Sequence, residues 1–177
     1  ESFNNLPDRS VGEIAVQSDC MLTEYFNRPD ATESVIKNGW YLTGDYGYVA
    51  DGELYVSGRK KDLIIVGGKN VYPQDLEALA CEVPGVHPGR TVAFGLFDES
   101  QGTEEVVIIA EVDTDDESEH ERIGDEIRKY VSKNSAIVAR HVRVVGPKWV
   151  IKTSSGKVAR TASKEKFIKE LEASQQS

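Results

Sequence analysis

The 177-residue sequence has few cysteines and no long apolar run. Cys20 and Cys81 are isolated from each other and from histidines, which predicts reduced thiols rather than a disulfide or a metal site. No segment approaches the roughly 18–20 apolar residues of a membrane-spanning helix. The N-terminus also lacks the pattern of a signal peptide. These absences predict a cytoplasmic protein without a membrane span and without metal ligands of its own.

The sequence also lacks an excess of positive charge. Its formal net charge is −9, which argues against nucleic acid as the main partner. The charge is uneven, because nearly all charged residues in 98–126 are acidic whereas most of those in 128–170 are basic. Two interpretations stay open: a solvated acidic loop followed by amphipathic basic elements, or a basic surface that meets an anion such as a phosphate.

From residue 62 onward, the apolar patterns predict an α+β fold, a small sheet with helices packed on it. DLIIV (62–66) is a short continuous apolar run and predicts a strand buried on both faces. Proline in the first turn predicts a helix over 72–83, and apolar residues at i, i+4 and i+8 predict another over 119–133. Further elements are predicted as strands at 91–97, 105–112 and 140–146 and a closing helix from about 161.

The first 57 residues predict a β-rich segment that is too short for a core of its own. Asp51-Gly52 joins two apolar runs within 46–57 and is a strong signal for a β-hairpin. A strand at 11–17 and a short helix at 29–37 precede it. Since the chain begins with Glu1 rather than Met, we expect a processed product or an excised piece of a larger protein.

Three stretches combine glycine with charged or hydroxyl residues: YLTGDYG (41–47), SGRKKDLIIVGGKN (57–70) and IKTSSGKVAR (151–160). The third does not match the Walker phosphate-loop pattern, because the first glycine and the Ser/Thr after the lysine are missing. Taken alone, it predicts only a flexible loop that presents Lys157.

Taken together and in this order, the stretches resemble the adenylate-forming enzymes: acyl-CoA synthetases, fatty acyl-AMP ligases, peptide-synthetase adenylation domains and luciferases. The resemblance runs from GEI (12–14) to the end of the chain. It implies that residues 1–60 are the C-terminal end of a large N-terminal domain and that 61–177 form a mobile C-terminal domain. It also implies the reaction, in which ATP and a carboxylate give an acyl-adenylate and pyrophosphate, and the acyl group then passes to a thiol.

The resemblance implies roles for three residues in adenylation. Asp45 would accept hydrogen bonds from both ribose hydroxyls of ATP, and Arg59 would contact the ribose and phosphates. Lys157 would bridge the substrate carboxylate and the α-phosphate. The plainer alternatives are a turn aspartate, a surface ion pair of Arg59 with an acid such as Asp62, and an exposed loop lysine.

Two further residues match positions that serve the change between the half-reactions. Lys61 matches the hinge about which the C-terminal domain rotates. Gly68 matches a glycine that lines the channel for the incoming pantetheine, and its alternative is a simple turn glycine.

The narrower branch is implied less directly. The segments 72–77, 87–96 and 104–112 look most like fatty acyl-AMP ligases, which implies a fatty acid substrate and an acyl carrier protein as acceptor. Gly67 also suits a CoA ligase, so CoA stays open as the acceptor. Residues 149–151 depart from the Leu-Pro pair that the family often has before this lysine loop, which leaves the entry of the loop undefined.

The family's pyrophosphate loop, adenine pocket, Mg²⁺-binding glutamate and acyl tunnel would lie in the missing N-terminal domain. We therefore expect this chain to be a C-terminal fragment that is inactive alone, with ATP and Mg²⁺ as cofactors of the whole enzyme. Two alternatives remain: an amino-acid or aryl-acid adenylation domain, and a non-catalytic module that binds a carrier protein.

Overall fold

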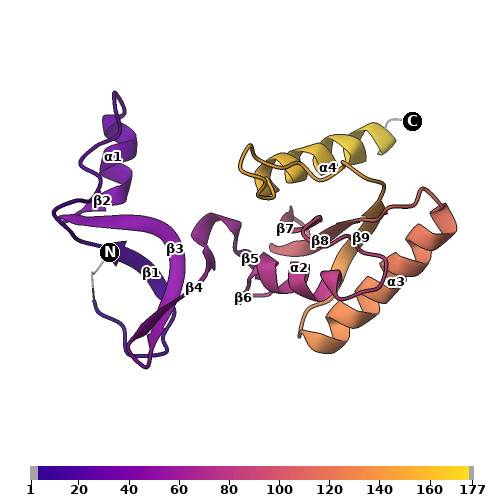
Figure 1. Ribbon diagram of the computed structural model, residues 1–177, viewed down its shortest axis with the longest axis horizontal. Helices are drawn as coiled ribbons and strands as arrows, with labels where there is room; N and C mark the ends of the chain where they lie inside the picture. Colours follow the sequence, from indigo (N-terminus) through magenta and orange to yellow (C-terminus); the bar gives the residue numbers. More distant parts are fainter. Residues whose placement is uncertain (1–3, 176–177) are drawn as a thin grey trace. The chain divides into compact units, whose positions relative to one another are not determined.

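The computed structural model describes residues 4–175 of the chain (Figure 1). The chain divides after Lys61 into two compact units. No helix in the described range is long and apolar enough to cross a membrane.

The first unit is built around one long strand, β3 (Trp40–Ala50). This strand pairs antiparallel with β1 (Gly12–Val16), β2 (Ile36–Lys37) and β4 (Glu53–Arg59). The short helix α1 (Pro29–Val35) begins at a proline, as predicted, and ends where β2 begins.

The predicted hairpin at Asp51-Gly52 is confirmed. Asp51 and Gly52 have φ angles of 55° and 82°, and Ala50 pairs with Glu53 across the turn. Positive φ at both central residues is the conformation of a type I′ turn, which matches the twist of the flanking strands. Only three residues of the first unit are buried within the described range: Gly47, Ala50 and Gly58. The prediction that this segment lacks a core of its own is therefore confirmed.

The second unit contains a three-stranded sheet of β7 (Thr91–Asp98), β8 (Thr103–Glu111) and β9 (Ala139–Val145). β8 lies in the middle, antiparallel to β7 and parallel to β9. A parallel pair needs a crossover connection, which the helix α3 (Glu117–Asn134) provides.

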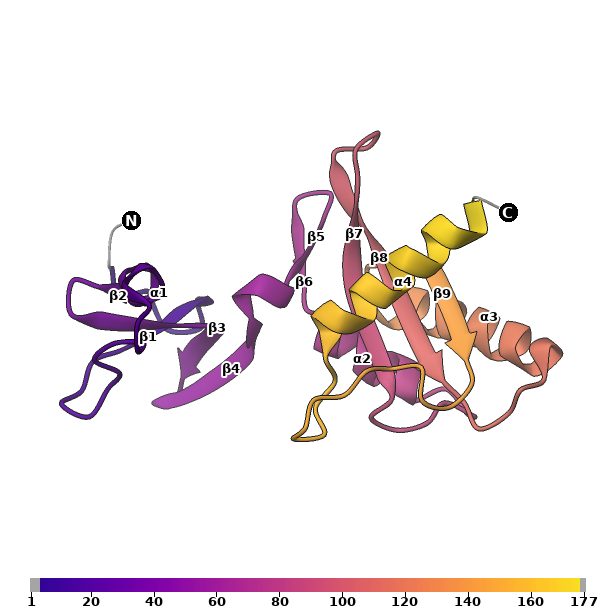
Figure 2. The ribbon, with the colours of Figure 1, turned by 90° about the horizontal axis from the view of Figure 1, so that it is seen from above.

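Helices cover both faces of this sheet (Figures 1 and 2). The helix α2 (Pro73–Cys81) and α3 pack on one face, and α4 (Arg160–Gln175) packs on the other. Successive strand residues therefore enter opposite cores: Ala93, Val106, Ile108 and Ala110 on the α2–α3 side, and Val92, Phe94, Val107 and Ile109 on the α4 side. The α+β fold predicted from the sequence is confirmed.

The predicted burial of one strand was wrong. Residues 62–66 were expected to form a strand buried on both faces, but β5 (Ile64–Val66) pairs only with β6 (Lys69–Val71) in a separate hairpin. Ile64 is 1% exposed whereas Ile65 is 50% exposed, because one face of this short ribbon is left uncovered by the core. The strands with two buried faces are β7 and β8.

Candidate functional site

Asp45 and Arg59 lie side by side in the first unit. They are paired partners across β3 and β4, and Arg59 Nε lies 3.4 Å from Asp45 Oδ1. The Asp45 side chain is 33% exposed and the Arg59 side chain 59%, so both remain open to a ligand. Asp62, the alternative partner considered for Arg59, instead accepts a hydrogen bond from Arg160.

The residues around Asp45 explain the local sequence YLTGDYG. Thr43 Oγ1 donates to the Ile14 carbonyl at 2.9 Å and accepts from the Asp45 N–H at 3.1 Å. Gly44 has a φ of 73°, which other residues rarely adopt. A Cβ atom at Gly47 would lie 2.5 Å from the Tyr55 carbonyl oxygen. The strand therefore fixes the Asp45 backbone through hydroxyl and glycine positions on both sides of it.

A tyrosine pair shares the electrostatic environment of Asp45. The hydrogen bond with Tyr25 raises the pKa of Tyr41, and burial and the negative charge of Asp45 raise it further. Tyr41 is therefore a neutral hydroxyl at neutral pH. The local groups at Asp45 are thus a carboxylate with two acceptor oxygens, a guanidinium and the neutral phenol of Tyr41, a set that can bind a polar, hydroxyl-bearing anion.

Lys61 is the last residue of the first unit and lies in the 3₁₀ turn Lys60–Asp62. Its neighbour Lys60 is bound to Glu13 through a 2.7 Å ion pair. Lys61 itself is exposed, and the described part of the chain offers its ammonium no ion-pair partner. The position of Lys61 at the boundary suits a pivot, although its role as a hinge stays a prediction.

Lys157 is exposed on a tight loop of the second unit. An antiparallel bridge between Lys152 and Val158 closes the loop. Within it, the Thr153 N–H donates to the Lys157 carbonyl at 2.8 Å, and Thr153 Oγ1 accepts from the Lys157 N–H at 3.2 Å. Gly156 turns the chain with a φ of 81°. The backbone of Lys157 is thus held, while its ammonium has no hydrogen-bond or ion-pair partner among residues 4–175.

The segment entering this loop is held by buried and half-buried contacts. Val150 is buried and donates its N–H to Glu111 Oε1 at 2.6 Å. Trp149 Nε1 donates to Glu170 at 3.1 Å, and Lys166 Nζ donates to the Trp149 carbonyl at 3.0 Å. Lys166 also lies 4.4 Å from the centre of the Trp149 ring, within range of a cation–π contact. Although the Leu-Pro pair is absent, the entry of the loop is well defined.

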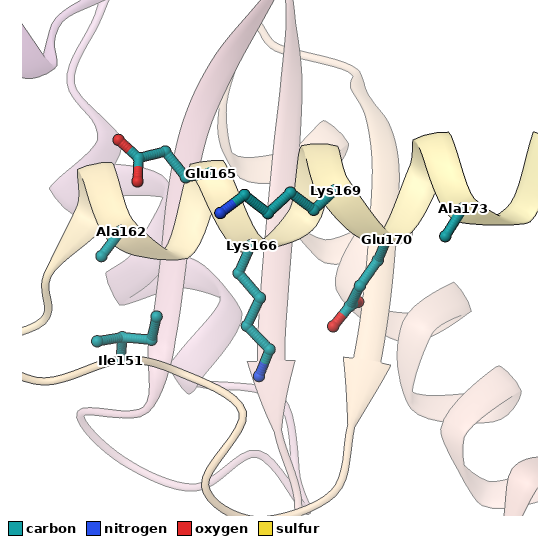
Figure 3. A pocket seen from close by; sticks show the side chains of 7 residues that line it. All are labelled: Ile151, Ala162, Glu165, Lys166, Lys169, Glu170 and Ala173. Atoms are coloured by element: carbon teal, nitrogen blue, oxygen red, sulfur yellow. The ribbon is translucent and has the colours of Figure 1, made fainter.

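The contacts on α4 border a shallow groove of about 420 Å³ (Figure 3). Its lining comes from α4 and the residue before Lys152: Ile151, Ala162, Glu165, Lys166, Lys169, Glu170 and Ala173. None of the predicted site residues lines the groove, so it is not a candidate for the nucleotide site.

Gly68 lies in the two-residue turn between β5 and β6. Gly67 and Gly68 have φ angles of 55° and 78°, and the Gly67 N–H donates to Thr103 Oγ1 at 2.7 Å. A Cβ atom added at Gly68 would meet no atom within 4 Å. Within the second unit, this turn and the Lys157 loop lie at opposite ends (Figure 2). The structure therefore does not bring Gly68 and Lys157 together.

Among residues 4–175 there is no cluster of three or more His, Cys, Asp or Glu side chains that could hold a metal ion.

Comparison with known proteins gives consistent matches over nearly the whole chain. No protein-family model matches it. The chain is 36% identical to the long-chain-fatty-acid–CoA ligase FadD13 of Mycobacterium tuberculosis over 161 residues, which are 90% of this chain and 30% of that protein. The structure of McyG A-PCP complexed with phenylalanyl-adenylate matches with a TM-score of 0.86 and 32% identity, covering 97% of this chain and 27% of that one. A fatty acyl-adenylate ligase, from a study of the E. coli and L. pneumophila enzymes, matches with a TM-score of 0.80 and 31% identity, covering 95% of this chain and 29% of that one.

The chain belongs to the adenylate-forming enzyme superfamily. Its mixed fold matches the C-terminal domain of these enzymes. It spans about 30% of the length of the FadD13 relative.

One charged cluster of the second unit was not predicted from the sequence. Arg160 binds Asp62, Glu77 and the Ala93 carbonyl directly after the Lys157 loop. Asp62 lies in the glycine-containing stretch 57–70 and Arg160 in the stretch 151–160, so 98 positions separate them. Since neither motif carries a signal for this pairing, only the folded chain identifies it.

Proposed function

We propose that this chain is the C-terminal part of an ATP-dependent ligase that forms fatty acyl-adenylates. In the proposed first step, a carboxylate oxygen of the fatty acid attacks the α-phosphorus of ATP, and pyrophosphate leaves. In the second step, the thiol sulfur of a pantetheine arm attacks the acyl carbon, and AMP leaves. Membership of the superfamily supports both steps, and the similarity to FadD13 and to a fatty acyl-adenylate ligase supports the fatty acid.

The observation that carries the proposal is the Lys157 loop. It presents an unpaired, exposed ammonium at a backbone position held by Thr153 and by a bridge at its base. A fixed cation is suited to stabilise the negative charge that develops during transfer to the α-phosphate. On this proposal Lys157 contacts the substrate carboxylate and the α-phosphate.

Asp45 and Arg59 would hold the nucleotide. The two carboxylate oxygens of Asp45 can accept from the two ribose hydroxyls, and Arg59 can turn its remaining N–H groups to a phosphate. ATP supplies the adenylyl group. Its Mg²⁺ would be bound by residues outside this chain, since residues 4–175 contain no cluster of three or more possible metal ligands. Lys61 would be the pivot between the half-reactions.

Gly68 and the acceptor belong to the second step. The turn that contains Gly67 and Gly68 presents no side chain, which suits the close passage of a pantetheine arm. We propose an acyl carrier protein or CoA as acceptor, both of which carry this arm. We also propose a cytoplasmic location, which suits the two free cysteines, Cys20 and Cys81.

A second candidate function has support from one comparison. The McyG structure contains phenylalanyl-adenylate and matches this chain with a TM-score of 0.86, which favours an amino-acid or aryl-acid adenylation domain. A panel of carboxylates assayed with the full-length protein separates the two candidates. Release of pyrophosphate with fatty acids, and not with amino or aryl acids, is the result expected for the leading proposal. Accumulation of acyl-AMP in the presence of CoA would identify a carrier protein as acceptor.

Replacing Lys157 tests the proposed chemistry. We expect Lys157→Ala in the full-length protein to lower the rate of acyl-AMP formation by roughly 10²–10³-fold, because one group that stabilises the transition-state charge is lost. Transfer from supplied acyl-adenylate to the thiol should continue. Lys152→Ala removes an exposed lysine from the same loop and should change both rates less than about twofold. A non-catalytic carrier-binding module would show neither activity before or after the substitution.

A further inference from the structure

Arg160 makes three hydrogen bonds to three separate segments of the second unit. Its Nη1 donates to Asp62 Oδ2 at 2.6 Å, its Nη2 donates to Glu77 Oε1 at 2.7 Å, and its Nε donates to the Ala93 carbonyl at 2.9 Å. The side chains of Arg160 and Asp62 are each 14% exposed. One guanidinium thus joins the first residue of α4 to α2, to β7 and to the start of the second unit.

The low exposure of this cluster strengthens its hydrogen bonds and makes the loss of any one partner costly. Glu77 Oε1 also accepts from the Ala93 N–H at 2.8 Å, so the acceptor is held by the same strand. Burial raises the pKa of Glu77 although Arg160 opposes this change, which indicates a poorly hydrated environment. Removing one partner of such a pair leaves the other charge buried and unmatched.

The chain connects this cluster directly to two predicted site residues. Arg160 is the third residue after Lys157, so it holds the outgoing end of the Lys157 loop. Asp62 follows Lys61, the predicted pivot. A fork of planar N–H groups fixes its partners in direction as well as in distance, which a lysine cannot do.

α4 has an anchor that does not depend on Arg160. Phe167 is 3% exposed and packs edge-on against Phe94, with 5.7 Å between the ring centres. Loss of the guanidinium should therefore leave the helix docked on the sheet. What changes is the first turn of α4 and the loop end that leads into it.

We propose that Arg160 is a positioning residue for Lys157, which fixes the outgoing end of the Lys157 loop against α2, β7 and Asp62. This inference rests on the proposed function, in which Lys157 acts in adenylation. Without Arg160, the outgoing end of the loop is held less firmly, so the backbone position from which Lys157 extends varies more. A misplacement of a reacting group by about 1 Å can lower a rate roughly 10²-fold. Because Lys157 is proposed to act in adenylation, we expect the loss of rate in that step.

The test compares Arg160→Met with a matched control in the full-length protein. Arg122 also bonds two carboxylates, those of Glu119 and Glu126, but on the exposed face of α3. We expect Arg160→Met to lower kcat for acyl-AMP formation by roughly 10²-fold with a change in the KM for ATP below about threefold, because ground-state binding at Asp45 and Arg59 is intact. Thiol transfer from supplied acyl-adenylate should be unchanged. Arg160→Lys should fall between wild type and Arg160→Met, and Arg122→Met should match wild type.

A second measurement needs no activity. In the 177-residue chain, Arg160→Met should lower the melting temperature more than Arg122→Met does, because two carboxylates of low exposure lose their partner. Amide hydrogen exchange at Gly156 and Lys157 should also speed up by a larger factor than exchange in the central strands of the second unit. If Arg160→Met does not fold, Asp62→Asn removes one charge of the cluster and should still lower kcat by roughly tenfold with the same pattern of KM and exchange.

Three outcomes would overturn the proposal: adenylation by Arg160→Met within about twofold of wild type, equal losses in both half-reactions, or unchanged exchange at Gly156 and Lys157. If Lys157→Ala also left adenylation intact, the proposed function would fail, while faster exchange in Arg160→Met would still show that Arg160 holds the loop.

Discussion

At Gly68 the backbone, rather than the space around the residue, requires glycine. Its φ of 78° lies in the left-handed region, yet an added Cβ would meet no atom within 4 Å. The turn conformation therefore explains the glycine within the chain itself. It also leaves an open position where a ligand could approach the backbone. A glycine needed only for the turn and a glycine needed for ligand passage can therefore be distinguished by substitution.

We expect Gly68→Ala to lower the stability of the chain by about 1–2 kcal/mol, because Ala is strained at positive φ. Gly68→Asn should cost less, since Asn tolerates this conformation. Urea unfolding of the chain measures both. In the full-length protein, Gly68→Asn should slow thiol transfer at least tenfold and spare acyl-AMP formation if the pantetheine arm passes here. Normal thiol transfer by a stable Gly68→Asn variant would leave only the turn interpretation.

Single residues were predictable from the sequence, but their partners were not. Asp45, Arg59 and Lys157 could be proposed because each stands in a motif of several residues whose order resembles a family. The contact of Arg59 with Asp45 depends on the register of β3 and β4, and the contact of Arg160 with Asp62 depends on the packing of the whole second unit. A motif describes neighbours along the chain, whereas these contacts join distant positions.

At the scale of elements, α3 has a side chain that caps its first turn. Asp116 Oδ1 accepts from the Ser118 N–H at 2.9 Å and from the Ser118 hydroxyl at 2.8 Å. A carboxylate at this position also interacts favourably with the helix dipole. The bond from the Ser118 hydroxyl, followed by the bond from its N–H, lowers the pKa of Asp116.

The lowered pKa of Asp116 predicts how acid affects α3. A group whose pKa is lower in the folded state stabilises the fold above its unfolded pKa, and this contribution is lost as pH falls through the folded pKa. Wild type should therefore lose stability relative to Asp116→Asn below about pH 4, because Asn caps a helix without titrating. Thermal unfolding of both proteins between pH 7 and pH 2, followed by helical circular dichroism, measures this difference. A constant difference across the range would contradict the prediction.

The elements with long periodic patterns were predicted well, and the shortest ones were not. The helices α2 and α3 were recognised from proline at the first turn and from Ile123, Ile127 and Val131 on one face, and these three side chains are buried. The strand β6 was missed because three residues carry no periodicity. Gly67-Gly68 is a known hairpin signal and could have identified it. The exposure of Ile65 could not be predicted, since a short apolar run does not show how many of its faces are covered.

At the scale of the whole molecule, the two units differ in how they bury apolar surface. The second unit has two cores on the faces of one sheet, whereas neither core contains a residue of the first unit. Most exposed large apolar side chains instead belong to the first unit: Leu6, Val11, Val16, Tyr25, Phe26, Trp40, Val49, Leu54, Tyr55 and Val56. Exposed apolar surface of this extent is typical of a segment that packs against further protein.

This difference bears on what the chain can do alone. The proposed nucleotide contacts, Asp45 and Arg59, lie in the unit without a core, and Lys157 lies in the other unit. We expect the isolated chain to show no carboxylate-dependent exchange of pyrophosphate into ATP, because the groups for adenine, Mg²⁺ and the acyl chain are proposed to lie outside it. Full-length protein at equal concentration is the positive control, and its Lys157→Ala variant sets the background.

Exchange by the isolated chain at a rate close to that of the full-length protein would contradict this prediction. It would mean that residues 4–175 already bind ATP and acid productively, although the first unit has almost no buried residues to fix Asp45 and Arg59 in place. Groups that are held in the productive geometry before the substrate binds lower the barrier to reaction, and a sheet without a core holds its side chains only loosely. On the proposed function, we therefore expect catalysis to depend on additional protein that covers the apolar faces of the first unit and so holds Asp45 and Arg59 in position.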